Sequence, residues 1–155
     1  MKRLAFVAVS LAVVVAAGCQ QRADVAAETT AVTAVLTSYI TSIEKEDMEL
    51  YGKVMAHDDG MVNYGTDGAP IVGWNSLKKL IEDQNAALSQ TKITANDVSV
   101  KVSPSGNWAW ATSLWDFKAV AGGKSLALPV RCTWILEKRD GRWLIVHFHK
   151  SIACS

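Results

Sequence analysis

The sequence predicts an α+β fold in which three N-terminal helices pack on a curved antiparallel sheet. Apolar residues recur at helical spacing between residues 32 and 88, whereas from Thr91 onward they alternate as in strands. Turns rich in glycine, proline and asparagine separate the alternating segments. Helices first and a strand meander afterwards are typical of helices gathered on one face of an antiparallel sheet.

The helices are predicted from the spacing of apolar residues and from their caps. Residues 32–43 carry apolar side chains three and four positions apart, which indicates an amphipathic helix. Asp47 is the expected N-cap of a second, short helix. Residues 61–64 resemble a short strand, and Asn75 or Ser76 is expected to cap a third helix. That third helix is expected to carry Leu77, Leu80, Ile81 and Leu88 on one side.

Four longer strands complete the expected domain. They are predicted at residues 93–102, 108–120, 125–138 and 142–152, joined by turns at 104–107, 122–123 and 140–141. A two-residue Gly122-Gly123 loop places Leu114 opposite Arg131. It also places Asp116 diagonal to Arg131, within reach of an ion pair.

The register of the last hairpin is open between two loops. A two-residue loop at 140–141 places Arg131 opposite Lys150, whereas a three-residue loop at 139–141 places Arg131 opposite His149. The three-residue loop is favoured, because a type I turn closed by a left-handed glycine suits an Asp-Gly pair.

This register gives the predicted sheet two different faces. One face is polar and is expected to line a ligand pocket, while the other is apolar and is expected to be buried in a homodimer, because helices can cover only one face. The predicted pocket face holds Trp110, Thr112, Leu114, Asp116, Arg131, Thr133, Ile135, Trp143, Ile145, His147 and His149. The predicted dimer face holds Trp115, Phe117, Val130, Cys132, Trp134, Leu136, Leu144, Val146 and Phe148.

The candidate functional residues follow from that pocket face and from the first helix. The catalytic candidates are His149 and His147 as bases, Arg131 as an electrophile and Tyr39 as a hydrogen-bond donor. Each also has a structural interpretation: an Arg131–Asp116 brace, hydrogen-bonded histidines, and a core tyrosine. His57, His147 and His149 could hold a metal in principle, but neither a metal nor a cofactor is expected. The predicted ligand-binding set is Tyr39, Asn63, Trp110, Asp116, Arg131, Thr133, His147 and His149.

The N-terminus predicts export and a lipid anchor. Lys2 and Arg3 precede an uncharged, mostly apolar stretch that is too short to span a membrane and ends in Ala-Ala-Gly before Cys19. Residues 1–18 are therefore expected to be a lipoprotein signal peptide, Cys19 the lipidated residue, 19–28 a tether and 29–155 the domain. A plain secretory signal is the alternative. The expected location is the periplasmic side of a bacterial membrane or the cell surface.

Length, charge and cysteine content bear on the number of domains, on nucleic-acid binding and on a possible disulfide. The chain has 155 residues and a net charge of +1 without a basic stripe, so one domain is expected and nucleic acid is not an expected partner. Export would allow a disulfide between Cys132 and Cys154, and this pairing is left open because the tail would have to fold back.

Several segments together resemble the SnoaL-like branch of the nuclear transport factor 2-like superfamily. The resemblance lies in residues 39–48, 63–67 with Gly73, 105–110, and the span 131–151 from Arg-x-Thr to His-x-Ser. It implies a cone-shaped α+β barrel, with three helices over a curved antiparallel sheet, of the kind seen in ketosteroid isomerases.

The same resemblance argues against two known chemistries. Tyr39 matches the oxyanion-binding tyrosine of ketosteroid isomerases, but Asn63 or Tyr64 stands in place of the aspartate base and Arg131 in place of the second aspartate. Limonene epoxide hydrolase has an arginine on that strand, followed by an aspartate where this chain has Thr133. Isomerisation of ketosteroids is therefore not expected.

Three functions remain open at the level of sequence. The favoured one is a membrane-anchored, exported lipoprotein that binds a small, partly apolar molecule in its cone pocket. The alternatives are a cofactor-independent lyase, isomerase or hydrolase that uses a pocket histidine and arginine, and a homodimeric interaction module with a vestigial pocket.

Overall fold

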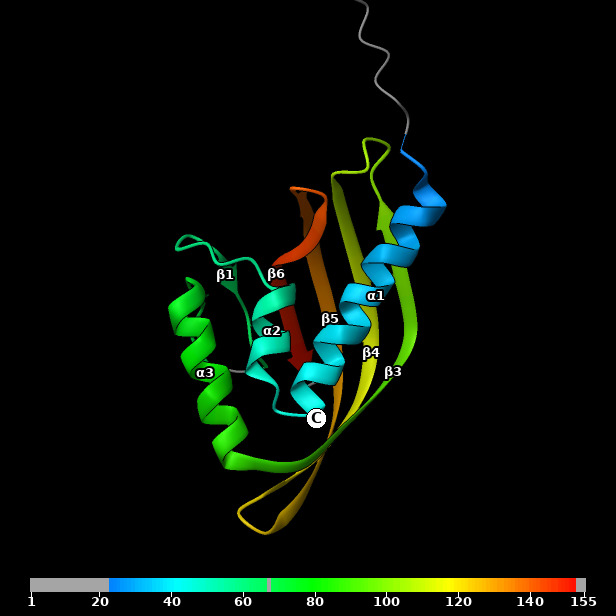
Figure 1. The fold of residues 1–155 in the computed structure, drawn as a ribbon. Helices are drawn as coiled ribbons and strands as arrows, with labels where there is room; N and C mark the ends of the chain where they lie inside the picture. The colour runs from blue at the N-terminus through cyan, green and yellow to red at the C-terminus, as the bar shows by residue number, and fades with distance from the viewer. Residues whose placement is uncertain (1–22, 67, 153–155) are drawn as a thin grey trace, which may run out of the picture.

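The computed structural model describes residues 23–66 and 68–152 and has the predicted α+β class. Helix α1 (Val25–Glu44) lies across a four-stranded antiparallel meander, while α2 and α3 lie toward its β6 edge (Figure 1). A two-stranded sheet accompanies this edge. The remaining bounds are α2 (Met48–Val54), β1 (Val62–Asn63), β2 (Ile71–Val72), α3 (Trp74–Ala87), β3 (Leu88–Val102), β4 (Trp108–Ala121), β5 (Lys124–Arg139) and β6 (Arg142–Ile152).

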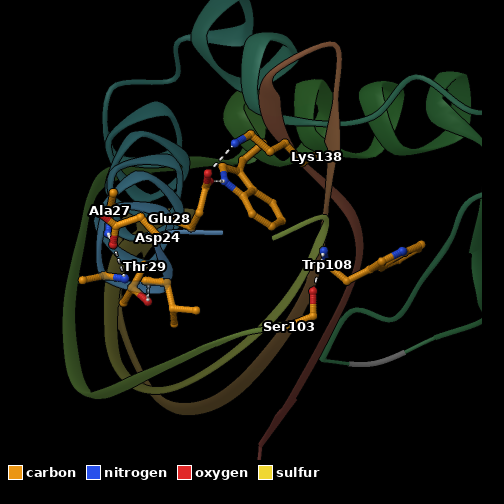
Figure 2. A network of polar contacts seen from close by, with 10 residues as sticks. Asp24, Ala27, Glu28, Thr29, Ser103, Trp108 and Lys138 are labelled. Carbon is orange, nitrogen blue, oxygen red and sulfur yellow. Dashed lines mark hydrogen bonds and ion pairs between the residues drawn. The ribbon is translucent and has the colours of Figure 1, made fainter. Parts of the chain in front are cut away.

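Helix α1 begins earlier than its apolar spacing indicates. Asp24 is the N-cap, and its carboxylate accepts hydrogen bonds from two backbone amides of the first turn, each at 3.1 Å. Glu28 then accepts from Lys138 Nζ at 2.5 Å and from Trp143 Nε1 at 2.7 Å (Figure 2). The start of α1, within the range expected to be a tether, is thus fastened to the β5–β6 hairpin. The Cys19 prediction lies outside the described residues.

The other two helices start at caps of different kinds. Asp47 caps α2 as predicted, with its Oδ1 2.8 Å from the Leu50 amide nitrogen. Helix α3 starts at Trp74 after Gly73, rather than after Asn75 or Ser76. Gly73 has φ 80°, and a Cβ there would lie 2.9 Å from the Asp59 carbonyl oxygen, so the turn requires glycine. Leu88, expected on the helix, is instead the first residue of β3.

The first of the two predicted hairpin registers is confirmed and the second is wrong. Leu114 pairs with Arg131 across the Gly122-Gly123 loop, as expected. At the β5–β6 turn, however, Arg139 pairs with Arg142, which makes a two-residue loop. Asp140 and Gly141 both have positive φ, 49° and 77°, the backbone that two-residue hairpins favour because it matches strand twist.

A β-bulge in β6 further changes which side chains share a face. Leu136 pairs with Ile145 but Ile135 pairs with His147, so Val146 is an extra residue on β6. Before the bulge Ile145 points to the buried side. After it Phe148 points inward and His147 points away, so the predicted common face for Trp143, Ile145, His147 and His149 is wrong.

The helices cover the apolar face of the sheet, not the polar one. Trp115, Trp134 and Phe148 are at most 2% exposed within a single chain, packed beneath α1. The prediction that this face forms a homodimer interface is therefore wrong, because it is the domain's own core.

Along the described residues, no helix is both long and apolar enough to cross a membrane.

Candidate functional site

Most of the residues predicted to line the pocket lie on the outer face of the sheet. This inversion overturns the expected concave wall of Arg131, Asp116 and His149 near Tyr39 and Asn63. Arg131 Nη2 donates to the Ile152 carbonyl at 3.4 Å, and Asp116 accepts from Asn96 at 3.1 Å instead of forming an ion pair with Arg131. The exposed residues of the predicted set are Trp110, Asp116, Arg131, Thr133 and His149.

The three histidines make contacts other than those expected of a common ligand pocket. His147 Nδ1 lies 2.6 Å from the Val62 carbonyl oxygen, which ties β6 to β1, and the Tyr64 ring meets both His147 and His149 edge-on. His57 instead stacks on Trp74, with ring centroids 4.0 Å apart. Across residues 23–66 and 68–152, no three His, Cys, Asp or Glu side chains gather where they could hold a metal ion.

Tyr39 and Asn63 are the two predicted site residues that lie inside the fold. Both are fully buried. Asn63 Oδ1 accepts from the Phe148 amide at 2.8 Å, so this side chain fastens β1 to β6. The Tyr39 hydroxyl has no hydrogen-bond partner among the described residues, and burial raises its pKa far above the usual value of 10.0. Tyr39 is thus a neutral phenol in the core.

A cavity of about 480 Å³ lies between α3, the segment that follows β1, and the inner face of the sheet. Figure 1 shows α3 and β1 on the β6 side of the sheet. Its volume lies within the range of small-molecule sites, roughly 300–1,000 Å³. The apolar walls are formed by Ile43, Ala69, Ile71, Leu80, Ile81, Leu88, Trp115, Phe117, Leu126, Leu128, Val130 and Phe148. The remaining lining residues are Gly65, Thr66, Gly68, Gln84 and Lys150.

Lys150 places an amine inside this cavity. Its Nζ lies 5.2, 5.0 and 4.9 Å from the ring centroids of Tyr39, Trp115 and Phe148. Lys150 is absent from the ion pairs that the described residues form. Burial lowers the pKa of Lys150 to about 8, because water no longer solvates the ammonium.

Cys132 lies directly opposite Lys150 on β5. It is a buried, free cysteine, and burial raises the pKa of its thiol to about 12, so the thiol stays neutral beside the amine. Cys154 lies outside the described residues, and the pairing of the two cysteines stays an open expectation.

Lys150 is the site residue that the sequence reasoning missed. It falls in phase with Phe148 and Ile152 on the inner face, where a lysine among apolar neighbours is unusual. The signal is thus one charged residue in an apolar alternation, but it lies on the face that the sequence predicts as a dimer interface and not as a pocket.

A second, more open hollow of about 670 Å³ lies between α2 and the β5–β6 hairpin. Several of its cations already have carboxylate partners: Lys53 pairs with Glu49 at 2.6 Å, and Arg139 with Asp58 at 2.7 Å. Its charges are largely balanced internally, so the inner cavity is the stronger candidate site.

Comparison with known proteins agrees with the fold. Residues 32–155 match the family described as the SnoaL-like domain. A comparison with functionally curated proteins found no match.

Solved structures share this architecture at low sequence identity. A presumed dehydratase of the nuclear transport factor 2-like family from Streptomyces avermitilis has a TM-score of 0.76 and 14% identity, covering 84% of this chain and 99% of that one. A superfamily member from Salmonella enterica serovar Typhimurium has a TM-score of 0.76 and 21% identity, with coverages of 84% and 94%. A ketosteroid isomerase-like protein from Erwinia carotovora has a TM-score of 0.69 and 19% identity, with coverages of 83% and 98%. At these identities the likeness concerns the fold alone.

Proposed function

The chain belongs to the SnoaL-like domain family, and we propose that it binds a small, largely apolar molecule in its inner cavity, with the ligand's polar group toward Lys150. The observation that carries this proposal is a cavity of about 480 Å³ with apolar walls and an amine among them. Small-molecule sites combine apolar walls with a few placed polar groups in this way.

The two alternative functions have less support. A lyase, isomerase or hydrolase that pairs His149 with Arg131 in the pocket loses its geometry, because both side chains are exposed on the outer face. An interaction module with a vestigial pocket would be expected to fill its interior with side chains, and the open cavity argues against it.

A titration with octanoate and octanol tests the location of the proposed site. Amide chemical shifts should change around the cavity, at Ile81, Val130 and Lys150. Leu128→Trp, which fills the cavity, should abolish the changes, while Val98→Trp on the exposed side of β3 should not. Shift changes gathered around Arg131 and His149 would place binding on the outer face and refute the proposal.

We also propose that the domain is exported and held at a membrane by a lipid on Cys19. The support is the N-terminal sequence, with a short apolar stretch that leads into Ala-Ala-Gly-Cys. Cys19→Ser should prevent acylation and shift the protein out of the membrane fraction. A processed Cys19→Ser chain that remains with the membrane would contradict the anchor.

We propose that the chain forms a homodimer through the outer face of the sheet. Large apolar side chains are exposed there, at Trp108, Trp110, Leu114 and Ile135. Trp110→Glu should therefore shift sedimentation toward the monomer. Val72→Glu, at a residue that is equally exposed at 52% on β2, is the matched control and should leave the oligomeric state unchanged. A monomeric wild-type chain would refute this proposal.

A further inference from the structure

The cavity holds hydrogen-bond donors that lack acceptors in the part of the chain that the structure describes. Lys150 Nζ forms none of the ion pairs among the described residues. The indole Nε1 of Trp115, another lining residue, is buried without a hydrogen-bond partner among residues 23–66 and 68–152, and Lys150 Nζ lies 5.0 Å from the Trp115 ring. Two neighbouring donors of one cavity, one of them an amine, are thus left without an oxygen.

The surrounding rings reduce the cost of burying the ammonium but do not neutralise its charge. Tyr39, Trp115 and Phe148 place their rings within about 5 Å of Nζ, the arrangement of a cation–π contact. A cation removed from water is stabilised far more by an anion that also accepts its hydrogen bonds. The folded chain supplies such an anion nowhere among the ion pairs of its described residues.

From this geometry we infer that the ligand is a monocarboxylate with an apolar tail, whose carboxylate accepts hydrogen bonds from Lys150 and whose tail contacts the walls around Leu128 and Val130. The inference rests on the proposed function, because it specifies the polar group of the molecule bound in that same cavity. One ammonium balances one carboxylate, whereas a doubly charged phosphate would leave a buried charge without a partner.

The inference also implies that, at a pH near or above the pKa of Lys150, the ligand binds with uptake of a proton. Pairing with a carboxylate favours the ammonium and raises the pKa of Lys150 from about 8 in the empty cavity. Among the described residues, the titratable groups that face Lys150 are Tyr39 from α1 and Cys132 from β5, and burial raises the pKa of both above that of Lys150. The facing residues from β4 and β6, Trp115 and Phe148, carry no charge.

Three probes with the same chain length test the inference: octanoate, octanol and octylamine. Calorimetry on the purified full chain should give an affinity for octanoate at least about tenfold above that for octanol, and no binding of octylamine. Lys150→Met should bring octanoate to the level of octanol, and Lys150→Arg should restore part of the preference. Lys101→Met, at an exposed lysine of β3, is the control and should behave as the wild type.

The possible outcomes separate this inference from the proposed function. Equal affinities of the wild type for octanoate and octanol would overturn the inference while leaving an apolar binding site. A preference for octylamine would overturn it as well. Failure of all three probes to bind would overturn the proposed function and the inference together. Retained binding of octanol by Lys150→Met would show that the variant is folded, so its loss of octanoate preference would support the inference.

Discussion

Replacing Lys150 with methionine is expected to stabilise the empty domain at neutral pH, although Lys150 is a site residue. Burial lowers the pKa of this amine from its usual value of 10.5 to about 8. At about 1.4 kcal/mol per pH unit, the buried ammonium then opposes folding by roughly 3 kcal/mol. Methionine has similar length and no charge, so it removes this cost without leaving a large void.

The pH dependence follows from the same shift. Between the folded pKa of about 8 and the unfolded pKa of 10.5, the unfolded chain binds more protons than the folded chain. The free energy of unfolding of the wild type therefore rises with pH through this window, and below it the full cost of the ammonium remains. The Lys150→Met variant lacks this contribution to the rise.

Urea unfolding at neutral pH and at a pH of about 10 measures both effects. The variant should exceed the wild type in free energy of unfolding by about 1–3 kcal/mol at neutral pH, and the difference should shrink at the higher pH. Lys101→Met controls for loss of a surface charge. A less stable Lys150→Met variant at neutral pH, or a difference that is independent of pH, would refute the reasoning.

Other residues give further tests. Glu28→Gln should lower the free energy of unfolding by about 1–3 kcal/mol in urea, because it weakens the bond to partly buried Lys138. That bond lowers the pKa of Glu28, so its contribution should be present above the usual 4.5 and disappear as pH falls, and an acid-insensitive difference would contradict it. Cys132 should resist iodoacetamide until the chain unfolds; rapid native labelling would disprove its burial. Gly73→Ala should reduce the urea midpoint through its contact with Asp59, and an unchanged midpoint would argue against that strain.

The elements and one register could be predicted because local signals specify them. Asp47 has the side chain that caps α2, and the Gly122-Gly123 pair has the backbone freedom that a two-residue hairpin loop needs. The family resemblance also holds, since the SnoaL-like domain matches most of the chain. These features depend on residues close in sequence or on a shared pattern.

The candidate site was placed on the wrong face for a reason that lies in the sheet. Both faces carry tryptophan and branched apolar residues: Trp110 and Leu114 are exposed, whereas Trp115 and Val130 are buried. The apolar content therefore did not identify the side that the helices cover, and that choice depends on tertiary packing. The inner face is apolar over nearly its whole length, which predicts that it is buried but does not decide between the helices and a second copy of the chain.

The bulge at Val146 had the larger consequence for function. One extra residue exchanges the two faces for the rest of β6, and it moves His147 and His149 away from the side that holds Ile145. A bulge leaves little trace in a short alternating segment. The bulge precedes Phe148, so it does not change the phase of Lys150, which shares the inner face with Phe148.

A crystal structure of the chain with octanoate tests the central claim most directly. The account predicts that a carboxylate oxygen lies about 2.7–2.9 Å from Lys150 Nζ, as in a charge-assisted hydrogen bond, with the alkyl chain along Leu128 and Val130. Octanoate bound on the outer face near Arg131, or bound in the cavity with its carboxylate turned away from Lys150, would contradict it.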